Sequence, residues 1–210
     1  WGDHAERVKA AWTELVTDDD IVIIAGDISW GLKLDEAMAD LDWIHELPGQ
    51  KVLLRGNHDL WWCRIQHLRT LYDDMHFLQN DCYYIEPLDL AICGSRGWPT
   101  PDTVSYTEHD EKMYLREQGR LRNSLVEAKK KGASKIIMAM HYPPAKVEET
   151  EFTRIMQEYG VTQCVYGHLH GMVAWTNGIK GEHGGIDYKL VSLDYLGARP
   201  KLIYDSEQEM

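Results

Sequence analysis

A short apolar run that ends in a glycine and three polar residues is the feature that most constrains the fold of this chain. The run covers residues 52–54, and Gly56 is followed at once by Asn57, His58 and Asp59. An apolar run of this length, bounded by turn residues, is typical of a buried strand. Ligands of open α/β sheets bind outside the carboxyl ends of the strands, so the sequence predicts a site at this strand end.

A second strand end precedes the first one along the chain. The apolar run 21–25 stops at Gly26 and delivers a carboxylate, Asp27. The separation between Asp27 and Asn57 is that of a strand, a crossover helix and the next strand, about 30 residues. The two strands are therefore expected to be parallel neighbours, with Asp27 and Asn57 at the same edge of the sheet.

Two further apolar runs end in histidine. Residues 135–140 are followed by His141, and residues 164–166 by His168 and His170 after a glycine. Carboxylate, amide oxygen and imidazole are ligands of Mn, Fe or Zn, and the lack of thiolates among them argues against a structural cysteine zinc site. Each of these residues alone would more often be structural. Their joint occurrence at strand ends predicts a metal centre.

Composition narrows the class of protein. The formal net charge of −12 disfavours a protein that holds nucleic acid by its phosphates. The four cysteines lack a Cys-x-x-Cys spacing, which indicates free thiols in a reducing cytosol. No apolar stretch is long enough to span a bilayer, and no signal peptide is visible. We therefore expect one domain over residues 1–210, located in the cytoplasm, with no membrane partner. The sequence carries no signal for an oligomeric state.

Hydrophobic periodicity predicts the remaining elements. Helices are expected over residues 3–16, 34–44, 61–71, 107–131 and 153–159. Further strands are expected at residues 88–93, 190–193 and 202–204. For the long helix, Thr107 and Asp110 form a capping pair at the start, and Gly132 follows the end.

Four sequence blocks together resemble the calcineurin-like metallophosphoesterase superfamily. They are Gly26-Asp27, the segment 56–59, a lone His141 and the segment 167–170, and they occur in the order of the superfamily. The resemblance covers most of the chain. It implies an α/β fold in which a β-sandwich is flanked by α-helices, in four layers α/β/β/α. It also implies two divalent metal ions, Mn, Fe or Zn, about 3.5–4 Å apart.

The resemblance assigns metal ligands by position. Asp27 would bridge the two ions, Asn57, His141 and His168 would complete one site, and His170 would serve the other. A hydroxide that bridges the metals would attack the phosphorus in line.

The resemblance also assigns residues that do not bind metal. His58 would contact the phosphate and protonate the leaving oxygen, and Asp59 could orient His58. Arg96, which follows the predicted strand 88–93, is the best remaining cation for a substrate phosphate. Its alternative role is an arginine in a surface ion pair.

One block of the superfamily is missing before Asp27. The first strand of the superfamily carries an Asp-x-His block that completes the site served by His170. Asp74 and His76 have this spacing, but they follow a predicted helix in a polar stretch, and we take the match as coincidence. We expect a longer native chain that carries the block upstream of Trp1. The alternative is a depleted metal site.

The substrate class follows from a second difference between this chain and the sequence pattern of the superfamily. Ser/Thr protein phosphatases of the superfamily place Asp-Arg-Gly after the block that corresponds to Gly26-Asp27, and this chain does not. The chain is more similar to the bacterial and archaeal phosphoesterases. We therefore predict a metal-dependent hydrolase of a phosphomonoester or phosphodiester of a small molecule, nucleotides included. Two alternatives stay open: a metal-binding interaction module without catalysis, and a nuclease of the same superfamily, against which the acidic charge counts.

Overall fold

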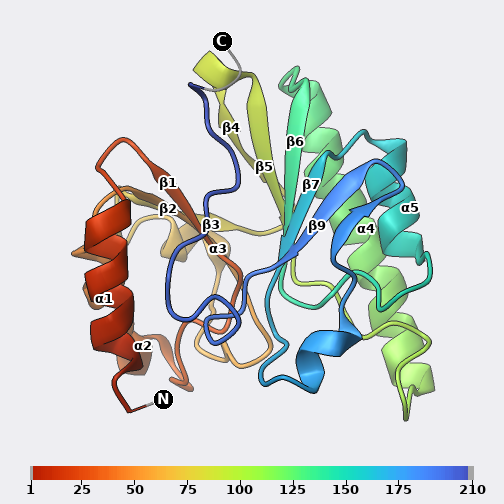
Figure 1. The fold of residues 1–210 in the computed structure, drawn as a ribbon, viewed down its shortest axis with the longest axis horizontal. Helices are drawn as coiled ribbons and strands as arrows, with labels where there is room; N and C mark the ends of the chain where they lie inside the picture. Colours follow the sequence, from red (N-terminus) through yellow and green to blue (C-terminus); the bar gives the residue numbers. More distant parts are fainter. Residues whose placement is uncertain (1, 208–210) are drawn as a thin grey trace.

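Two β-sheets pack together and carry helices on their outer faces, as the computed structural model of residues 2–207 shows (Figure 1). The first sheet has three parallel strands in the order β1-β2-β3, which are β1 (Ile21–Ile24), β2 (Gln50–Leu54) and β3 (Met75–Leu78). The parallel pairing of β1 with β2 confirms the predicted crossover unit.

The second sheet has the strand order β4-β5-β6-β7-β9-β8. Its strands are β4 (Cys82–Ile85), β5 (Leu90–Ser95), β6 (Lys135–Met140), β7 (Gln163–Tyr166), β8 (Gly181–His183) and β9 (Ile186–Leu190). The four central strands β5, β6, β7 and β9 are parallel, whereas β4 and β8 are antiparallel edges.

The helices cover the outer faces of the two sheets. On the side of the first sheet lie α1 (His4–Leu15), α2 (Leu34–His45) and α3 (Ile65–Leu68), and on the side of the second lie α4 (Glu108–Lys130) and α5 (Glu151–Glu158). Short 3-10 turns, Glu86–Leu88 and Ala174–Asn177, complete the described elements. The Thr107 and Asp110 side chains form the predicted capping box of α4. The expected four-layer α/β architecture is confirmed.

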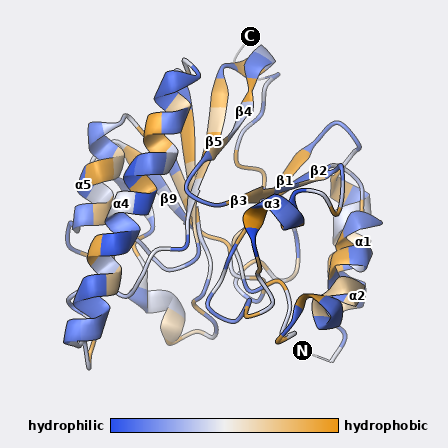
Figure 2. Ribbon diagram, turned by 180° about the vertical axis from the view of Figure 1, so that it is seen from behind, coloured by the Kyte–Doolittle hydropathy of each residue, from blue (hydrophilic) through white to orange (hydrophobic). Residues whose placement is uncertain are grey.

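The central strands β2, β5 and β6 are largely apolar on both faces because both faces are covered. On β2, Leu53 lies in one buried cluster with Leu41 of α2, whereas its neighbour Leu54 lies in another with Ala139 and Val165 of the second sheet. Figure 2 shows polar and apolar residues alternating along the helices, and Leu121 and Leu125 of α4 are among the apolar residues that are buried. Within the described chain no helix combines the length and the apolar character needed to cross a membrane.

Several predicted elements differ from the structure. The helix expected over residues 61–71 is only α3, because Trp61 is buried in the turn before it and donates its indole N–H to Asp59 at 3.0 Å. Residues 202–204 form no strand, and the last strand, β9, ends at Leu190 rather than beginning there.

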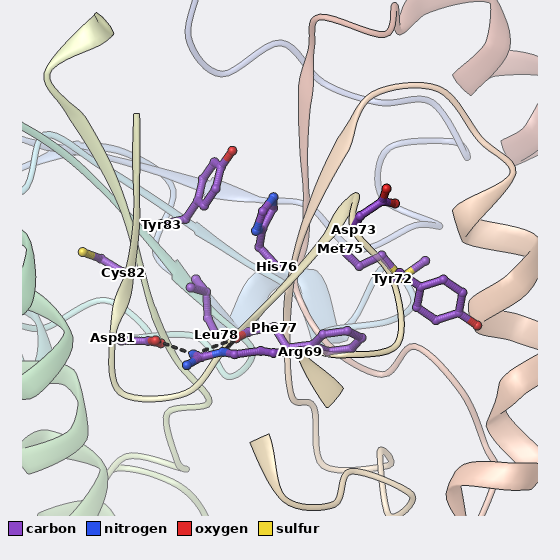
Figure 3. Close-up of a pocket in the computed structure, with 10 residues that line it drawn as sticks. All are labelled: Arg69, Tyr72, Asp73, Met75, His76, Phe77, Leu78, Asp81, Cys82 and Tyr83. Carbon is purple, nitrogen blue, oxygen red and sulfur yellow. Dashed lines mark hydrogen bonds and ion pairs between the residues drawn. The ribbon is translucent and has the colours of Figure 1, made fainter. Parts of the chain in front are cut away.

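The strands β3 and β4 were not predicted from the sequence, because both are short and polar residues flank them. A cavity of about 310 Å³ opens between them, and Figure 3 shows its lining. The His76 ring on β3 lies 4.2 Å from the Tyr83 ring on β4, centroid to centroid. His76 also bonds Gln50, so its side chain is engaged outside the metal centre.

Candidate metal centre

Two glycines allow the loops after β1 and β2 to touch each other. A Cβ atom at Gly56 would lie 2.1 Å from Asp27 Oδ1, and one at Gly26 would lie 2.6 Å from the Gly56 nitrogen. Gly26 also has a φ of +88°, which favours glycine. The glycines of both blocks are therefore required by the close approach of the loops that carry Asp27 and Asn57.

The buried Asp59 side chain connects these two loops by hydrogen bonds. It is fully buried, and its two carboxylate oxygens accept five hydrogen bonds of 2.7–3.1 Å. The donors are the backbone amides of Asp27, Ile28, Ser29 and Gly56 and the indole of Trp61. These bonds direct the Asp59 carboxylate to the two loops and to Trp61, and the expected contact with the His58 side chain is not among them.

Asp27 and His168 both have left-handed backbones, with φ of 56° and 68°. Such angles are uncommon outside glycine and concentrate at functional sites, where the surroundings hold them in place. For Asp27, the surroundings are the bond from its own N–H to Asp59 and the bond from the His58 N–H to Asp27 Oδ1, at 2.8 Å each. The turn thereby aims the Asp27 carboxylate across the loops toward β6.

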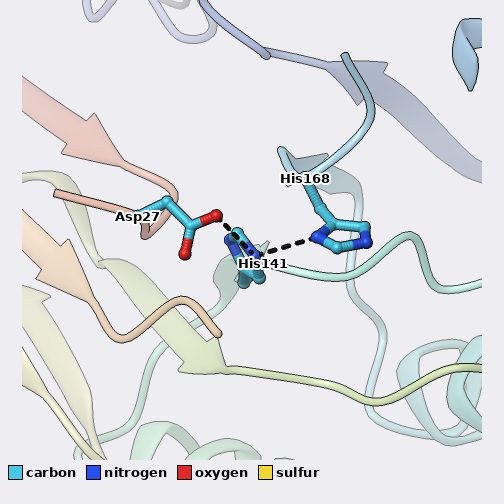
Figure 4. Close-up of side chains that lie close together, drawn as sticks. All are labelled: Asp27, His141 and His168. Atoms are coloured by element: carbon cyan, nitrogen blue, oxygen red, sulfur yellow. Dashed lines mark hydrogen bonds and ion pairs between the residues drawn. The ribbon is translucent and has the colours of Figure 1, made fainter. Parts of the chain in front are cut away.

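His141 is buried, and the backbone fixes its tautomer. Its Nδ1 lies 2.8 Å from the carbonyl oxygen of Ala25, which can only accept, so Nδ1 carries the proton. The unprotonated Nε2 then faces Asn57 Oδ1 at 2.7 Å, His168 Nδ1 at 3.2 Å and Asp27 Oδ2 at 3.4 Å. Figure 4 shows Asp27 and His168 on either side of His141.

Burial keeps both imidazoles neutral. It lowers the pKa of His141, against the attraction of Asp27. It also lowers the pKa of His168, together with repulsion from His141, to about 4. Near neutral pH both rings are in the neutral form that binds metals.

The donor set fits a divalent cation. Asn57 Oδ1, His141 Nε2 and the Asp27 carboxylate are all acceptors, and no proton on His141 Nε2 bridges them. Bonds of about 2.1 Å to an ion place adjacent ligand atoms about 3 Å apart in octahedral geometry. Four separations among these atoms and His168 Nδ1 are 2.7–3.4 Å, and the ligand atoms of Asp27, His141 and His168 all lie within 4.8 Å of one another. These four residues could therefore hold one metal ion between them.

His170 lies on the same loop but outside this converging group. Its Nδ1 lies 2.9 Å from Asp194 Oδ1, and the carboxylate also accepts from the amides of Gly171 and Tyr195. Burial opposes ionisation of Asp194, but the bonds from Gly171 and His170 outweigh it and lower its pKa. Asp194 was not predicted as a site residue, although it follows the run 190–193 as the other site residues follow their apolar runs.

His58 and Arg96 lie beside the converging group. The exposed His58 ring lies 4.2 Å from the exposed Trp30 ring. The His58 N–H donates to Asp27 Oδ1 at 2.8 Å, which places this residue next to the centre. Arg96 lies over the Trp98 ring at 4.7 Å, and its Nε is buried without a hydrogen bond. In the part of the chain that the structure describes Arg96 makes no ion pair, so the alternative of a surface ion pair is wrong.

The two packed sheets and the ligand set at their strand ends define a metallophosphoesterase. A sequence model of the calcineurin-like phosphoesterase family matches residues 1–172, and the chain belongs to this family. Its ligand groups agree with the divalent metals that the family usually binds.

Curated relatives match only a short part of the chain. The Gene 66 protein of Mycobacterium phage L5 is 44% identical over 57 residues, which are 27% of this chain and 27% of that protein. The Gene 66 protein of Mycobacterium phage D29 is 42% identical over 57 residues, which are 27% and 28%. The match thus spans about a quarter of the length of these relatives. A solved structure of a protein of unknown function from Aquifex aeolicus is similar with a TM-score of 0.48 and 14% identity, covering 95% of this chain and 81% of that one.

Proposed function

We propose that this protein hydrolyses a phosphomonoester or phosphodiester of a small molecule with the help of divalent metal ions. The observation that carries the proposal is the convergence of four ligand atoms on one point, three of them acceptors without a bridging proton. Membership of the calcineurin-like phosphoesterase family supports the reaction class. The excess of negative charge supports a small substrate rather than nucleic acid.

The residues of the centre have separate tasks. A divalent cation, when bound by Asp27, Asn57, His141 and His168, supplies Lewis acidity and lowers the pKa of a water molecule toward neutrality. His58 donates a proton to the leaving oxygen from the loop that Asp59 fastens. Asp27 links the two tasks, because Oδ1 accepts from the His58 N–H while Oδ2 faces His141.

A second ion belongs to the same proposal. His170 would be its ligand through Nε2, because Nδ1 is directed to Asp194. Mn, Fe and Zn suit this mixture of nitrogen and oxygen donors.

The compartment is also part of the proposal. All four cysteines, Cys63, Cys82, Cys93 and Cys164, are free thiols. Free thiols agree with the reducing cytosol that we expect for this protein.

The test is turnover of p-nitrophenyl phosphate and bis-p-nitrophenyl phosphate with added Mn²⁺, for the wild type and His58→Asn. We expect turnover by the wild type and a loss of about 100-fold or more in kcat for His58→Asn, as for removal of a general acid. The variant should bind as much metal as the wild type, since His58 is not a ligand. Metal binding without turnover of either substrate would contradict the proposal and favour the interaction module.

A further inference from the structure

Four arginines line one small cavity beside the metal centre. The cavity has a volume of about 110 Å³ and lies between the ends of β2, β3 and β5 and one face of α4. Its charged lining consists of Arg55, Arg96, Arg116, Arg120 and Glu117, and we call this cavity the arginine pocket. Four cations against one carboxylate are unexpected in a chain with a formal net charge of −12.

The single carboxylate of the pocket is already engaged. Glu117 is buried, its Oε1 pairs with Arg120 at 2.6 Å, and its Oε2 accepts from Ser95 at 3.3 Å. Among the described residues the other three arginines form no ion pair. The pocket therefore contains arginines that no ion pair neutralises, although the Glu117 carboxylate attracts Arg55 and Arg96.

Two of these cations are partly desolvated. Burial lowers the pKa of Arg55, against the attraction of Asp59, and it lowers the pKa of Arg96, against the attraction of Glu117. Arg96 Nε is buried without a hydrogen-bond partner, and Arg55 Nε donates to the Asp59 carbonyl at 3.2 Å. Desolvated charges that form no ion pair are costly, so an anion that enters the pocket would be stabilised.

The pocket adjoins the metal centre through the chain itself. Arg55 is two residues from Asn57, which limits their Cα separation to about 7.6 Å. The carbonyl of Arg96 accepts from the Tyr142 N–H at 3.0 Å, and the Tyr142 ring lies 4.3 Å from the His168 ring. A ligand with one anionic group at the metal centre could therefore place another in the pocket.

We propose that the arginine pocket binds a second phosphate group of the substrate, so that the preferred substrates are small molecules with two phosphates. The planar guanidinium groups match the oxygens of a phosphate, and the volume suits a tetrahedral anion rather than a nucleoside. The inference rests on the proposed hydrolase function. Inorganic phosphate could bind the same arginines. The experiment distinguishes it from a phosphate group of the substrate.

The variant is Arg116→Gln, because Arg116 is exposed on α4 and has no part in the metal centre. Its matched control is Lys112→Gln, which removes one positive charge from the same helix outside the pocket. Binding of inorganic phosphate to the chelator-treated protein is measured by calorimetry. The metal-free centre presents acceptors to an anion, so we expect phosphate to bind in the pocket, about tenfold more weakly in Arg116→Gln and unchanged in Lys112→Gln.

The second measurement compares kcat/KM for adenosine 3′,5′-bisphosphate and adenosine 5′-monophosphate with Mn²⁺. We expect a preference for the bisphosphate that falls about tenfold in Arg116→Gln only. An unchanged preference would overturn the inference and leave the pocket as a site for free phosphate. Absence of phosphate binding to the metal-free wild type would overturn it even if the enzyme turns over. If no substrate is turned over, the proposed function fails, and the inference about the substrate fails with it. Phosphate binding to the metal-free protein would then still show whether the arginine pocket binds an anion.

Discussion

Among residues 2–207, two clusters of histidine and carboxylate have their ligand atoms within 4.8 Å of one another. One is the metal centre of Asp27, His141 and His168, and the other is the group His45, Asp73 and Asp74 beside α2. In the second cluster the protein supplies its own cation. The Lys51 ammonium is buried, and it contacts Asp74 and the carbonyls of Leu47 and His45.

The two clusters differ in whether protein cations already neutralise their carboxylates. His45 Nδ1 lies 2.6 Å from Asp74, so this carboxylate has two nitrogen partners. Burial opposes ionisation of Asp74, but the bonds from Lys51 and His45 prevail and lower its pKa. In the metal centre, burial instead leaves two neutral imidazoles facing oxygen acceptors. Both clusters contain histidine and carboxylate, so residue type alone does not distinguish them. The cluster that suits a metal ion is the one whose acceptor atoms have no protein cation beside them.

The largest expected effect is on activity. Replacing His141 with Ala removes the buried Nε2 around which the other ligand atoms gather. We expect kcat/KM to fall by more than about 100-fold, beyond the loss of 10–100-fold typical of a group that only supports a ligand. The counterpart in the other cluster, His45→Ala, should keep wild-type kcat/KM. Equal losses of kcat/KM in the two variants would show that the two clusters do not differ in function.

The next effect is on stability. Asp59→Ala leaves four loop amides and an indole N–H without their acceptor. An unsatisfied buried group costs about 1–3 kcal/mol, so we expect a loss of at least about 3 kcal/mol in the free energy of unfolding, measured in urea. A loss below about 1 kcal/mol would show that Asp59 does not hold the loops.

The second cluster is expected to matter for stability alone. Asp74→Asn leaves the buried Lys51 ammonium without its counter-charge, which should cost about 3 kcal/mol at pH 7. Because the pKa of Asp74 is lowered in the folded protein, its contribution is complete above the usual value of 3.8 and is lost as pH falls through the lower folded value. Urea unfolding should therefore show the gap between wild type and Asp74→Asn closing in acid. A gap that widens in acid would contradict this pairing.

The smallest effect concerns His170. Asp194→Asn keeps an oxygen for His170 but replaces a carboxylate that accepts three hydrogen bonds. We expect affinity for the ion served by His170 to fall about tenfold, measured by Mn²⁺ titration of activity. The centre at His141 should retain its ion. An unchanged titration would remove Asp194 from the account.

The sequence predicted the ligand residues because each follows an apolar run at a strand end. Asp27, Asn57, His141 and His168 were found in this way, and the structure brings them together. The role of Asp59 was not readable, since its partners include amides about 30 residues away along the chain. Hydrogen bonds between loops depend on how close those loops come, and only the folded structure reveals that distance.

The second cluster illustrates the same limit. Lys51 stands at the start of an apolar strand, where a lysine is ordinarily exposed. Its burial follows from β3, a short strand that the hydrophobic pattern did not reveal and that places Asp74 beside it. The arginine pocket was only partly visible, since Arg96 stood out after a strand, whereas Arg116 and Arg120 read as ordinary surface residues of a long helix.

The most direct test of the central claim is metal content by elemental analysis after loading with Mn²⁺ and removal of the excess. The samples are the wild type, His168→Ala and His45→Ala, one histidine from each cluster. If Asp27, Asn57, His141 and His168 hold a metal ion, we expect at least one bound ion per chain in the wild type and in His45→Ala, and none in His168→Ala. A wild type without metal, or a His168→Ala variant that keeps its ion while His45→Ala loses it, would contradict the account.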